Sequence, residues 1–252
     1  MSTGSCRIFN AGNTHVQIAE LTGDSLRLME TLPTRDFRLE SFTAESMAAA
    51  SVVPELENRF REAGAFIVSP RMENCPVDLS EMEHPETLGA DRLANAASLI
   101  VSGPLPALCV DFGTAINLEF VDRDRRMRGG AILPGRNILR QSLNDYTAKL
   151  PLTALTENVP EFPGGNTVDA INLGTDCAAV GAVKELLRRM RLAFPGEQIR
   201  CVACGGDAPF FLRELSGFEL ADALFTLRGI AELYRCGTEG RTVKRTDSQP
   251  LS

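Results

Sequence analysis

The stretch RIFNAGNTHVQIAEL, residues 7–21, is an apolar run that is interrupted by a tight turn. A second stretch of the same kind, CVDFGTAINLEFVD, occupies residues 109–122. In each, an Asn or Asp stands two residues before a glycine, a threonine follows, and apolar residues alternate after the turn. This pattern predicts a strand, a glycine turn and a second strand in both places. Their recurrence predicts a duplicated unit, although the apolar alternation is one residue out of phase between the two copies.

Turns of this type are common structural hairpins, but they also suit the binding of phosphates. Glycine lets backbone N–H groups approach an anion closely, and the hydroxyls of Thr14 and Thr114 add donors. An acidic residue ahead of the glycine can hold a hydrated Mg²⁺. Two such turns facing each other across a cleft would hold a nucleoside triphosphate from both sides.

The composition excludes several classes of protein. The chain has 252 residues, is 44% hydrophobic and 23% charged, and carries a net charge of -7, which argues against general affinity for nucleic acid. The longest apolar stretch, residues 93–110, is broken by Gly and Pro, so no membrane partner is expected. Seven scattered cysteines and the lack of a basic-then-apolar leader predict a cytoplasmic protein, with Cys201 and Cys204 as buried strand residues rather than zinc ligands.

Strand and helix patterns alternate along the chain, which predicts an α/β fold. Pro54 marks the expected start of the first helix, and Asp91 and Arg92 lie near the start of the second. Strands are expected within 7–10, 15–21, 42–53, 65–70, 108–122, 129–134 and 199–204, and helices within 54–64, 85–103, 136–150, 166–194 and 225–237.

Several motifs in this order resemble those of the type III pantothenate kinases. They are NAGNT (10–14), SVVP (51–54), PETLGADR (85–92), DFGTA (111–115), GGAILPG (129–135), YTAKLP (146–151), NTVDAINLG (166–174) and CGGDA (204–208). The resemblance runs from residue 7 to about residue 230. It implies two ribonuclease-H-like domains of the actin-like ATPase superfamily, at residues 1–108 and 109–238, with a nucleotide cleft between them. Residues 239–252 are predicted to form a disordered tail.

The same resemblance implies an activity. Members of the family phosphorylate pantothenate with ATP to give 4'-phosphopantothenate, the first step towards coenzyme A. Mg²⁺ and a monovalent cation, K⁺ or NH₄⁺, are the implied cofactors, and a homodimer is the implied assembly. Pantothenate and ATP are therefore the expected partners of this chain.

The pantothenate side of the site is implied residue by residue. Asp91, in the segment Gly89-Ala-Asp-Arg, matches the general base that accepts the proton of the alcohol, and Arg92 matches the residue that holds the substrate carboxylate. Without the motifs these two would be an exposed charge pair of a helix. Thr167 matches a hydroxyl that faces pantothenate, or else is the N-cap of a helix.

The ATP side uses both turns. The first phosphate loop matches at Asn10, Gly12, Asn13 and Thr14, and the second at Gly113 and Thr114, with Asp111 as the metal ligand. Gly205 and Gly206 either accommodate the nucleoside or form a plain turn from strand to helix. The Pro134-Gly135 turn either shapes the substrate side or is structural.

Four departures from the family pattern leave the activity open. Asn10 replaces an Asp, Met82-Glu83-His84 replaces a Tyr and an Asp-Asn pair, Ile116-Asn117 replaces two Thr, and Arg136 replaces a small apolar residue. Asn10 removes a charge aimed at the metal, which we expect to weaken turnover about tenfold to a hundredfold. The alternatives are a nucleotide-binding homologue with a regulatory role, or a kinase for a different small alcohol.

Overall fold

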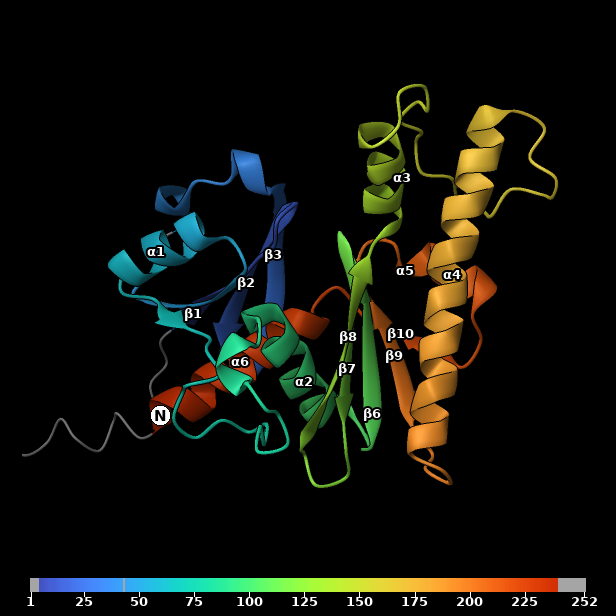
Figure 1. Ribbon diagram of the computed structural model, residues 1–252. Coiled ribbons are helices and arrows are strands. Elements are labelled where there is room, and N and C mark those ends of the chain that lie inside the picture. The colour runs from blue at the N-terminus through green and yellow to red at the C-terminus, as the bar shows by residue number, and fades with distance from the viewer. Residues whose placement is uncertain (1–4, 43, 240–252) are drawn as a thin grey trace, which may run out of the picture. The chain divides into compact units, whose positions relative to one another are not determined.

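The computed structural model describes residues 5–42 and 44–239, and the chain in it forms two compact units (Figure 1). Of the described residues, the first unit comprises 5–42, 44–105, 121–129 and 222–239, and the second comprises 106–120 and 130–221. Apart from its first residue, the predicted disordered tail lies outside the described residues. No helix in the described part of the chain is both long and apolar enough to cross a membrane.

The first sheet has the strand order β3-β2-β1-β4-β5. Its strands are β1 (Ser5–Ala11), β2 (His15–Thr22), β3 (Ser25–Pro33), β4 (Ser46–Ser51) and β5 (Phe66–Ile67). β1 is antiparallel to β2, as the hairpin pattern predicts, and parallel to β4. The central strand β1 therefore ends at the glycine turn, beside the end of β4.

The second sheet repeats this order as β8-β7-β6-β9-β10. Its strands are β6 (Ala107–Phe112), β7 (Ala115–Val121), β8 (Met127–Pro134), β9 (Arg200–Cys204) and β10 (Phe218–Leu220). β6 takes the place of β1, and its partner β9 runs parallel to it. The matching orders confirm the duplicated unit that the two glycine turns predict, with three strands in sequence followed by a parallel neighbour.

The two turns differ in length by one residue. In the first, Gly12 N donates to His15 O over 2.9 Å, whereas in the second, Gly113 N donates to Ala115 O over 3.1 Å. The first turn thus holds one residue more between the same two kinds of strand. This difference accounts for the phase offset in the apolar alternation of the sequence.

The core of the first unit contains a group of aromatic rings beneath α1 (Pro54–Glu62). Phe9 of β1 lies 4.9 Å from Phe60 of α1 and 6.1 Å from Phe37, measured between ring centroids. Helix α1 begins at Pro54 as predicted, because proline suits the first helical position.

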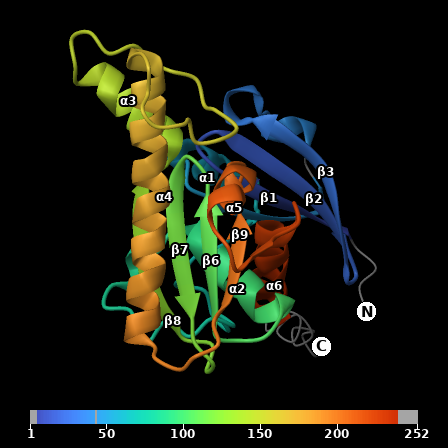
Figure 2. The ribbon, with the colours of Figure 1, turned by 90° about the vertical axis from the view of Figure 1, so that its right-hand side faces the viewer.

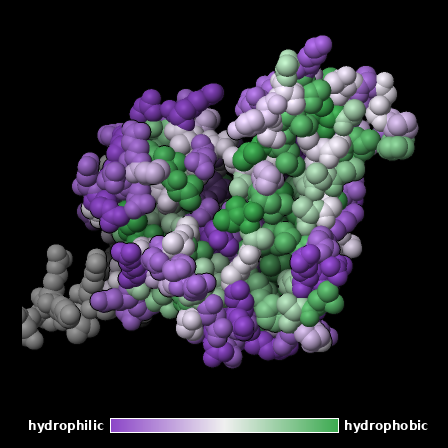
Figure 3. Space-filling view, viewed as in Figure 1, coloured by the Kyte–Doolittle hydropathy of each residue, from purple (hydrophilic) through white to green (hydrophobic). Residues whose placement is uncertain are grey.

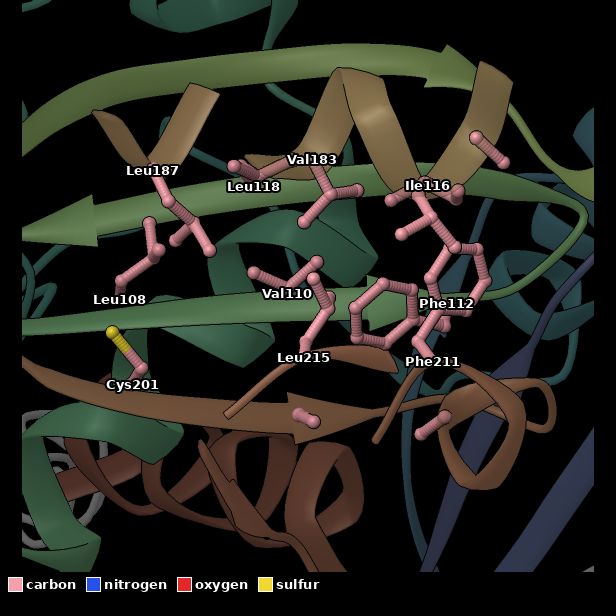
Figure 4. Packing of buried hydrophobic residues seen from close by; sticks show 14 of the residues in the cluster. Leu108, Val110, Phe112, Ile116, Leu118, Val183, Leu187, Cys201, Phe211 and Leu215 are labelled. Carbon is pink, nitrogen blue, oxygen red and sulfur yellow. The ribbon is translucent and has the colours of Figure 1, made fainter. Parts of the chain in front are cut away.

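The core of the second unit lies between its sheet and α4 (Thr167–Ala193), which runs along the strands (Figure 2). Figure 4 shows Val183 and Leu187 of α4 directed at Leu118 and Val110 of the sheet. Phe112 stacks on Phe211 of α5 (Ala208–Glu214), with ring centroids 4.2 Å apart. The segment predicted as one or two helices is one continuous helix, preceded in the chain by α3 (Arg136–Asp145).

Helix α6 (Phe225–Glu239) follows the second unit in the chain but belongs to the first, where it packs against α2 (Ala90–Ser102). Ser98 of α2 donates to the carbonyl of Phe225, and Thr226 donates to Asn95 over 2.8 Å. The division that the resemblance implied placed this closing helix with residues 109–238, whereas the contacts place it with the first unit. The expected start of α2 at residue 85 is wrong, because Pro85–Thr87 form a separate 3-10 turn.

The close approach of α6 to α2 depends on Gly229. A Cβ atom at this position would overlap the carbonyl oxygen of Ala94. Gly229→Ala is therefore expected to lower the free energy of unfolding by about 2 kcal/mol through overpacking, measured by urea denaturation. Gly181→Ala on α4 is the matched control, because its Cβ meets open space and alanine favours a helix by up to about 1 kcal/mol. Equal effects of both substitutions would contradict the packing argument.

Candidate active site

Each unit carries part of the set of residues that the sequence singles out. The first unit contains Asn10, Gly12, Asn13, Thr14, Gly89, Asp91 and Arg92, and the second contains Asp111, Gly113, Thr114, Thr167, Gly205 and Gly206.

The turn between β1 and β2 is fastened by Thr34, just after β3. Thr34 Oγ1 donates to Gly12 O over 2.7 Å, and Thr34 N donates to Thr14 O over 2.9 Å. Asn13 and Thr14 are exposed. The turn is thus held by Thr34, and the side chains of Asn13 and Thr14 lie at the surface.

Asn10 stands on β1 opposite Gln17 of β2. Its Nδ2 donates to Gln17 Oε1 over 3.1 Å. The amide is therefore part of a neutral cross-strand pair. An aspartate at position 10 could accept a hydrogen bond from Gln17 once the amide group of Gln17 is rotated. The cross-strand pair therefore suits either Asn or Asp at this position.

Asp91 and Arg92 lie in the first turn of α2, with Gly89 as its N-cap residue. Asp91 Oδ1 accepts from Arg92 N over 2.8 Å, and the missing side chain of Gly89 leaves the space that this oxygen occupies. Burial raises the pKa of the Asp91 carboxyl, and the N–H and charge of Arg92 oppose the rise. A half-buried carboxylate with a raised pKa has the character of a general base.

In the second unit, the turn Asp111-Phe112-Gly113-Thr114 is held by backbone hydrogen bonds from two other segments. Gly135 N donates to Thr114 O over 3.0 Å, and Asp207 N donates to Phe112 O over 2.9 Å. The Pro134-Gly135 segment and the turn after β9 therefore both lie directly against the second phosphate loop.

Gly205 brings the turn after β9 against Asp111. Its φ of +88° favours glycine, and a Cβ atom there would overlap Asp111 Oδ1 and Phe112 O. The backbone of Gly205 therefore lies directly against the side chain of Asp111 and the end of β6. The carboxylate of Asp111 is the kind of ligand that fits Mg²⁺, which binds proteins through one or two carboxylates and fills its other positions with phosphates and water.

Thr167 is the first residue of α4 and is exposed. The alternative interpretation of Thr167 as the N-cap is wrong, because Asn166 caps the helix and accepts from Asp169 N over 3.0 Å. Thr167 lines a largely apolar groove of about 550 Å³ between α3 and α4. Figure 3 shows hydrophobic residues on the surface over these helices.

Four charged side chains of the second unit were missed as a group by sequence reasoning: Arg136 and Arg140 of α3, Asp176 of α4 and Asp207. Arg136 is 2% exposed, and its Nε contacts Asp176 Oδ1 at 2.8 Å while its Nη1 contacts Asp207 Oδ1 at 2.9 Å. Arg140 Nη2 also reaches Asp176 Oδ1 at 2.9 Å. The available signal was the four-residue spacing of the two arginines, which predicts that they share one helix face.

Cys201 and Cys204 are buried in β9, as predicted. Cys204 Sγ lies 3.5 Å from Cys109 Sγ of β6, and burial raises the pKa of the Cys109 thiol to about 11. Within the described ranges, no three His, Cys, Asp or Glu side chains gather as a metal-ligand cluster.

A family model described as type III pantothenate kinase matches residues 8–189. The chain belongs to the type III pantothenate kinase family. A type III pantothenate kinase of Rubrobacter xylanophilus is 33% identical and aligns with 88% of this chain and 94% of its own length. The family assignment predicted from the motif order is confirmed.

Two solved structures show the fold. A putative Baf family transcriptional activator from Campylobacter jejuni matches with a TM-score of 0.61 at 20% identity, over 91% of this chain and 97% of its own. MreB5 of Spiroplasma citri bound to ADP matches with a TM-score of 0.50 at 12% identity, over 98% of this chain and 99% of its own. The predicted α/β fold is confirmed by these two likenesses.

The raised pKa of Asp91 has a consequence for stability. Because burial disfavours the ionised carboxyl in the folded state, Asp91→Asn is expected to raise the free energy of unfolding at neutral pH. The gain should disappear below the unfolded pKa of about 3.9, where both states hold the proton, and grow as pH rises through the raised folded pKa. Urea denaturation at neutral pH and at about pH 3 measures it.

Asp78 is the matched control for this measurement. Its exposed carboxyl accepts from Ser80 N over 2.9 Å, and this hydrogen bond lowers its pKa. Asp78→Asn is therefore expected to lose stability at neutral pH, the opposite sign. A loss of stability at neutral pH in Asp91→Asn would contradict the assignment of Asp91 as a desolvated carboxylate.

Proposed function

We propose that this chain transfers the γ-phosphoryl group of ATP to the primary hydroxyl of pantothenate, giving 4'-phosphopantothenate, the first intermediate towards coenzyme A. Membership of the type III pantothenate kinase family supports the reaction. The observation that supports specific residue roles concerns Asp91. It is half-buried, its pKa is raised, and it stands at the position of the general base in the family motif.

In the proposed reaction, Asp91 accepts the hydroxyl proton as the alcohol oxygen attacks the γ-phosphorus. The raised pKa brings the carboxylate closer to the operating pH, which favours proton transfer. Arg92 binds the pantothenate carboxylate through its guanidinium fork, and the exposed hydroxyl of Thr167 faces the substrate. Gly89 keeps the space into which the Asp91 carboxylate turns.

The two glycine turns hold ATP in this proposal. The N–H groups around Gly12 and Gly113 and the hydroxyls of Thr14 and Thr114 donate to phosphate oxygens. Asp111 holds Mg²⁺, which neutralises phosphate charge when bound. Gly205 and Gly206 accept the nucleoside, and the missing side chain of Gly206, whose Cβ would meet nothing within 4 Å, leaves room for it.

We further propose a homodimer and a requirement for K⁺ or NH₄⁺. The dimer is supported by the large apolar side chains left exposed around the groove of α3 and α4, which are of the kind that a second copy covers. They are Ile138, Leu152, Leu155, Phe162 and Val168. The monovalent cation is implied by the family alone.

The experiment that tests the function is the ATP- and Mg²⁺-dependent phosphorylation of pantothenate with K⁺ present. Asp91→Asn is expected to lower kcat by about 10²–10⁴, the usual contribution of a general base. Asp78→Asn, an exposed aspartate outside the proposed site, should leave kcat unchanged. An Asp91→Asn variant as active as the natural chain would overturn the assignment of the base.

One observation favours a second candidate, a nucleotide-binding homologue with a regulatory role. Asn10 occupies the place equivalent to Asp111, but it is neutral and is already engaged with Gln17. Such a chain would bind Mg-ATP in calorimetry without phosphorylating pantothenate. A kinase for a different small alcohol would turn over ATP only with that alcohol.

Asn10→Asp separates these candidates. Restoring a carboxylate aimed at the metal is expected to raise kcat by about tenfold to a hundredfold, because charge-assisted contacts are roughly twice as strong as neutral ones. Asn74→Asp adds the same charge at an exposed position and should have no effect. The comparison is made by steady-state kinetics at several Mg²⁺ concentrations. No gain from Asn10→Asp would show that the side chain does not act on the metal.

A further inference from the structure

Arg136 and Asp207 lie on two separate segments that both contact the second phosphate loop. We infer that this ion pair is a clamp that positions the turn Asp111–Thr114 for the phosphates of ATP. The inference rests on the proposed function and deepens it by naming two further positioning residues. It is supported by the backbone contacts of the turn and by the burial of Arg136.

The turn is gripped between two chain segments by backbone contacts. On one side, a Cβ atom at Gly135 would lie 2.5 Å from both Gly113 O and Thr114 O, so only glycine allows this approach. On the other side, Gly205 has the same relation to Asp111 and Phe112. The turn can keep its shape only while these two segments stay at a constant separation.

The clamp joins the two segments through residues adjacent to these contacts. Arg136 directly follows Gly135, and its Nη1 lies 2.9 Å from Asp207 Oδ1. Asp207 in turn donates from its own backbone N to Phe112 O over 2.9 Å. The ion pair therefore sets the distance between the two segments. Its two members are well placed to do so, because Asp207 contacts the turn and Arg136 follows a residue that contacts it.

The arginine is itself held rigidly on its other sides. Its Nη2 donates to Thr156 O over 2.7 Å, and Nε and Nη2 contact the two oxygens of Asp176 at 2.8 Å and 3.2 Å. The guanidinium carbon lies 3.3 Å from the ring centroid of Phe210. A planar fork with five donors can satisfy all these partners at once, which the single ammonium group of lysine cannot do.

Because Arg136 is buried, its ion pair with Asp207 is better explained by a positioning role than by a contribution to stability. The free energy needed to remove two charges from water is about as large as the free energy gained from their attraction. Apolar residues can therefore often replace a buried ion pair without loss of stability. What the pair adds is a fixed geometry between the segments on either side of the loop.

The clamp is tested with Asp207→Ala, which removes the acceptor from a side chain that is 22% exposed and so is tolerated by the fold. The KM for ATP is expected to rise about tenfold, from the loss of one partner of a buried charge, while the KM for pantothenate stays unchanged. Hydrogen exchange at residues 111–114 should become faster. Asp207→Asn, which keeps a neutral acceptor, should give a smaller rise in the KM for ATP.

Glu185→Gln provides the matched control. Glu185 pairs with Arg188 at 2.7 Å and Arg189 at 2.8 Å on the exposed face of α4, with no contact to the loop. It should change neither KM nor the exchange at residues 111–114. Arg136→Lys is the second variant of the clamp, and we expect it to behave like Asp207→Ala.

Two results would overturn the clamp. The first is an unchanged KM for ATP with unchanged exchange at residues 111–114 in Asp207→Ala. The second is a parallel loss of thermal stability and of affinity for both substrates, which would reveal a purely structural role. If the natural chain binds Mg-ATP but does not phosphorylate pantothenate, the proposed function fails, and ATP calorimetry with hydrogen exchange still decides the clamp. A natural chain that binds no ATP overturns both.

Discussion

The parallel pairing of β6 with β9 is the constraint on which the geometry of the turn Asp111–Thr114 depends. In this register Asp111 lies opposite Cys204, so the glycines that follow β9 must pass the carboxylate at the end of β6. Gly205 can do so only without a side chain and with a positive φ. The first sheet has the same parallel pairing, in which Asn10 lies opposite Ala50 of β4.

The duplication makes the difference between the two units informative. Asn10 and Asp111 stand at equivalent ends of equivalent strands, one neutral and one charged. The neutral residue pairs with Gln17, while the charged one lies against the backbone of Gly205. In the proposed site, the metal ligand would therefore come from the second unit and the base from the first.

Several residues of the candidate site are costly for folding. Asp91 is an ionisable group whose charged form is disfavoured by burial, and Arg136 and Asp176 are charges almost fully removed from water. Such groups are poor sources of stability but hold a chosen geometry or a chosen basicity. The stability of each unit comes instead from its apolar core, with aromatic rings beneath α1 and the face of α4 against the second sheet.

The sequence by itself determined the family, the α/β class, the repeat of the glycine turns and the start of α1 at Pro54, because these rest on local patterns and motif order. It did not determine that α6 belongs with the first unit, that α2 begins at Ala90, or that Asn166 caps α4. Only the tertiary structure placed Arg136 between Asp176 and Asp207 and set Gly135 and Gly205 against one turn. The reason is physical, because these contacts join residues that are far apart in the chain. No local periodicity encodes which distant residue a buried charge or a glycine backbone will contact.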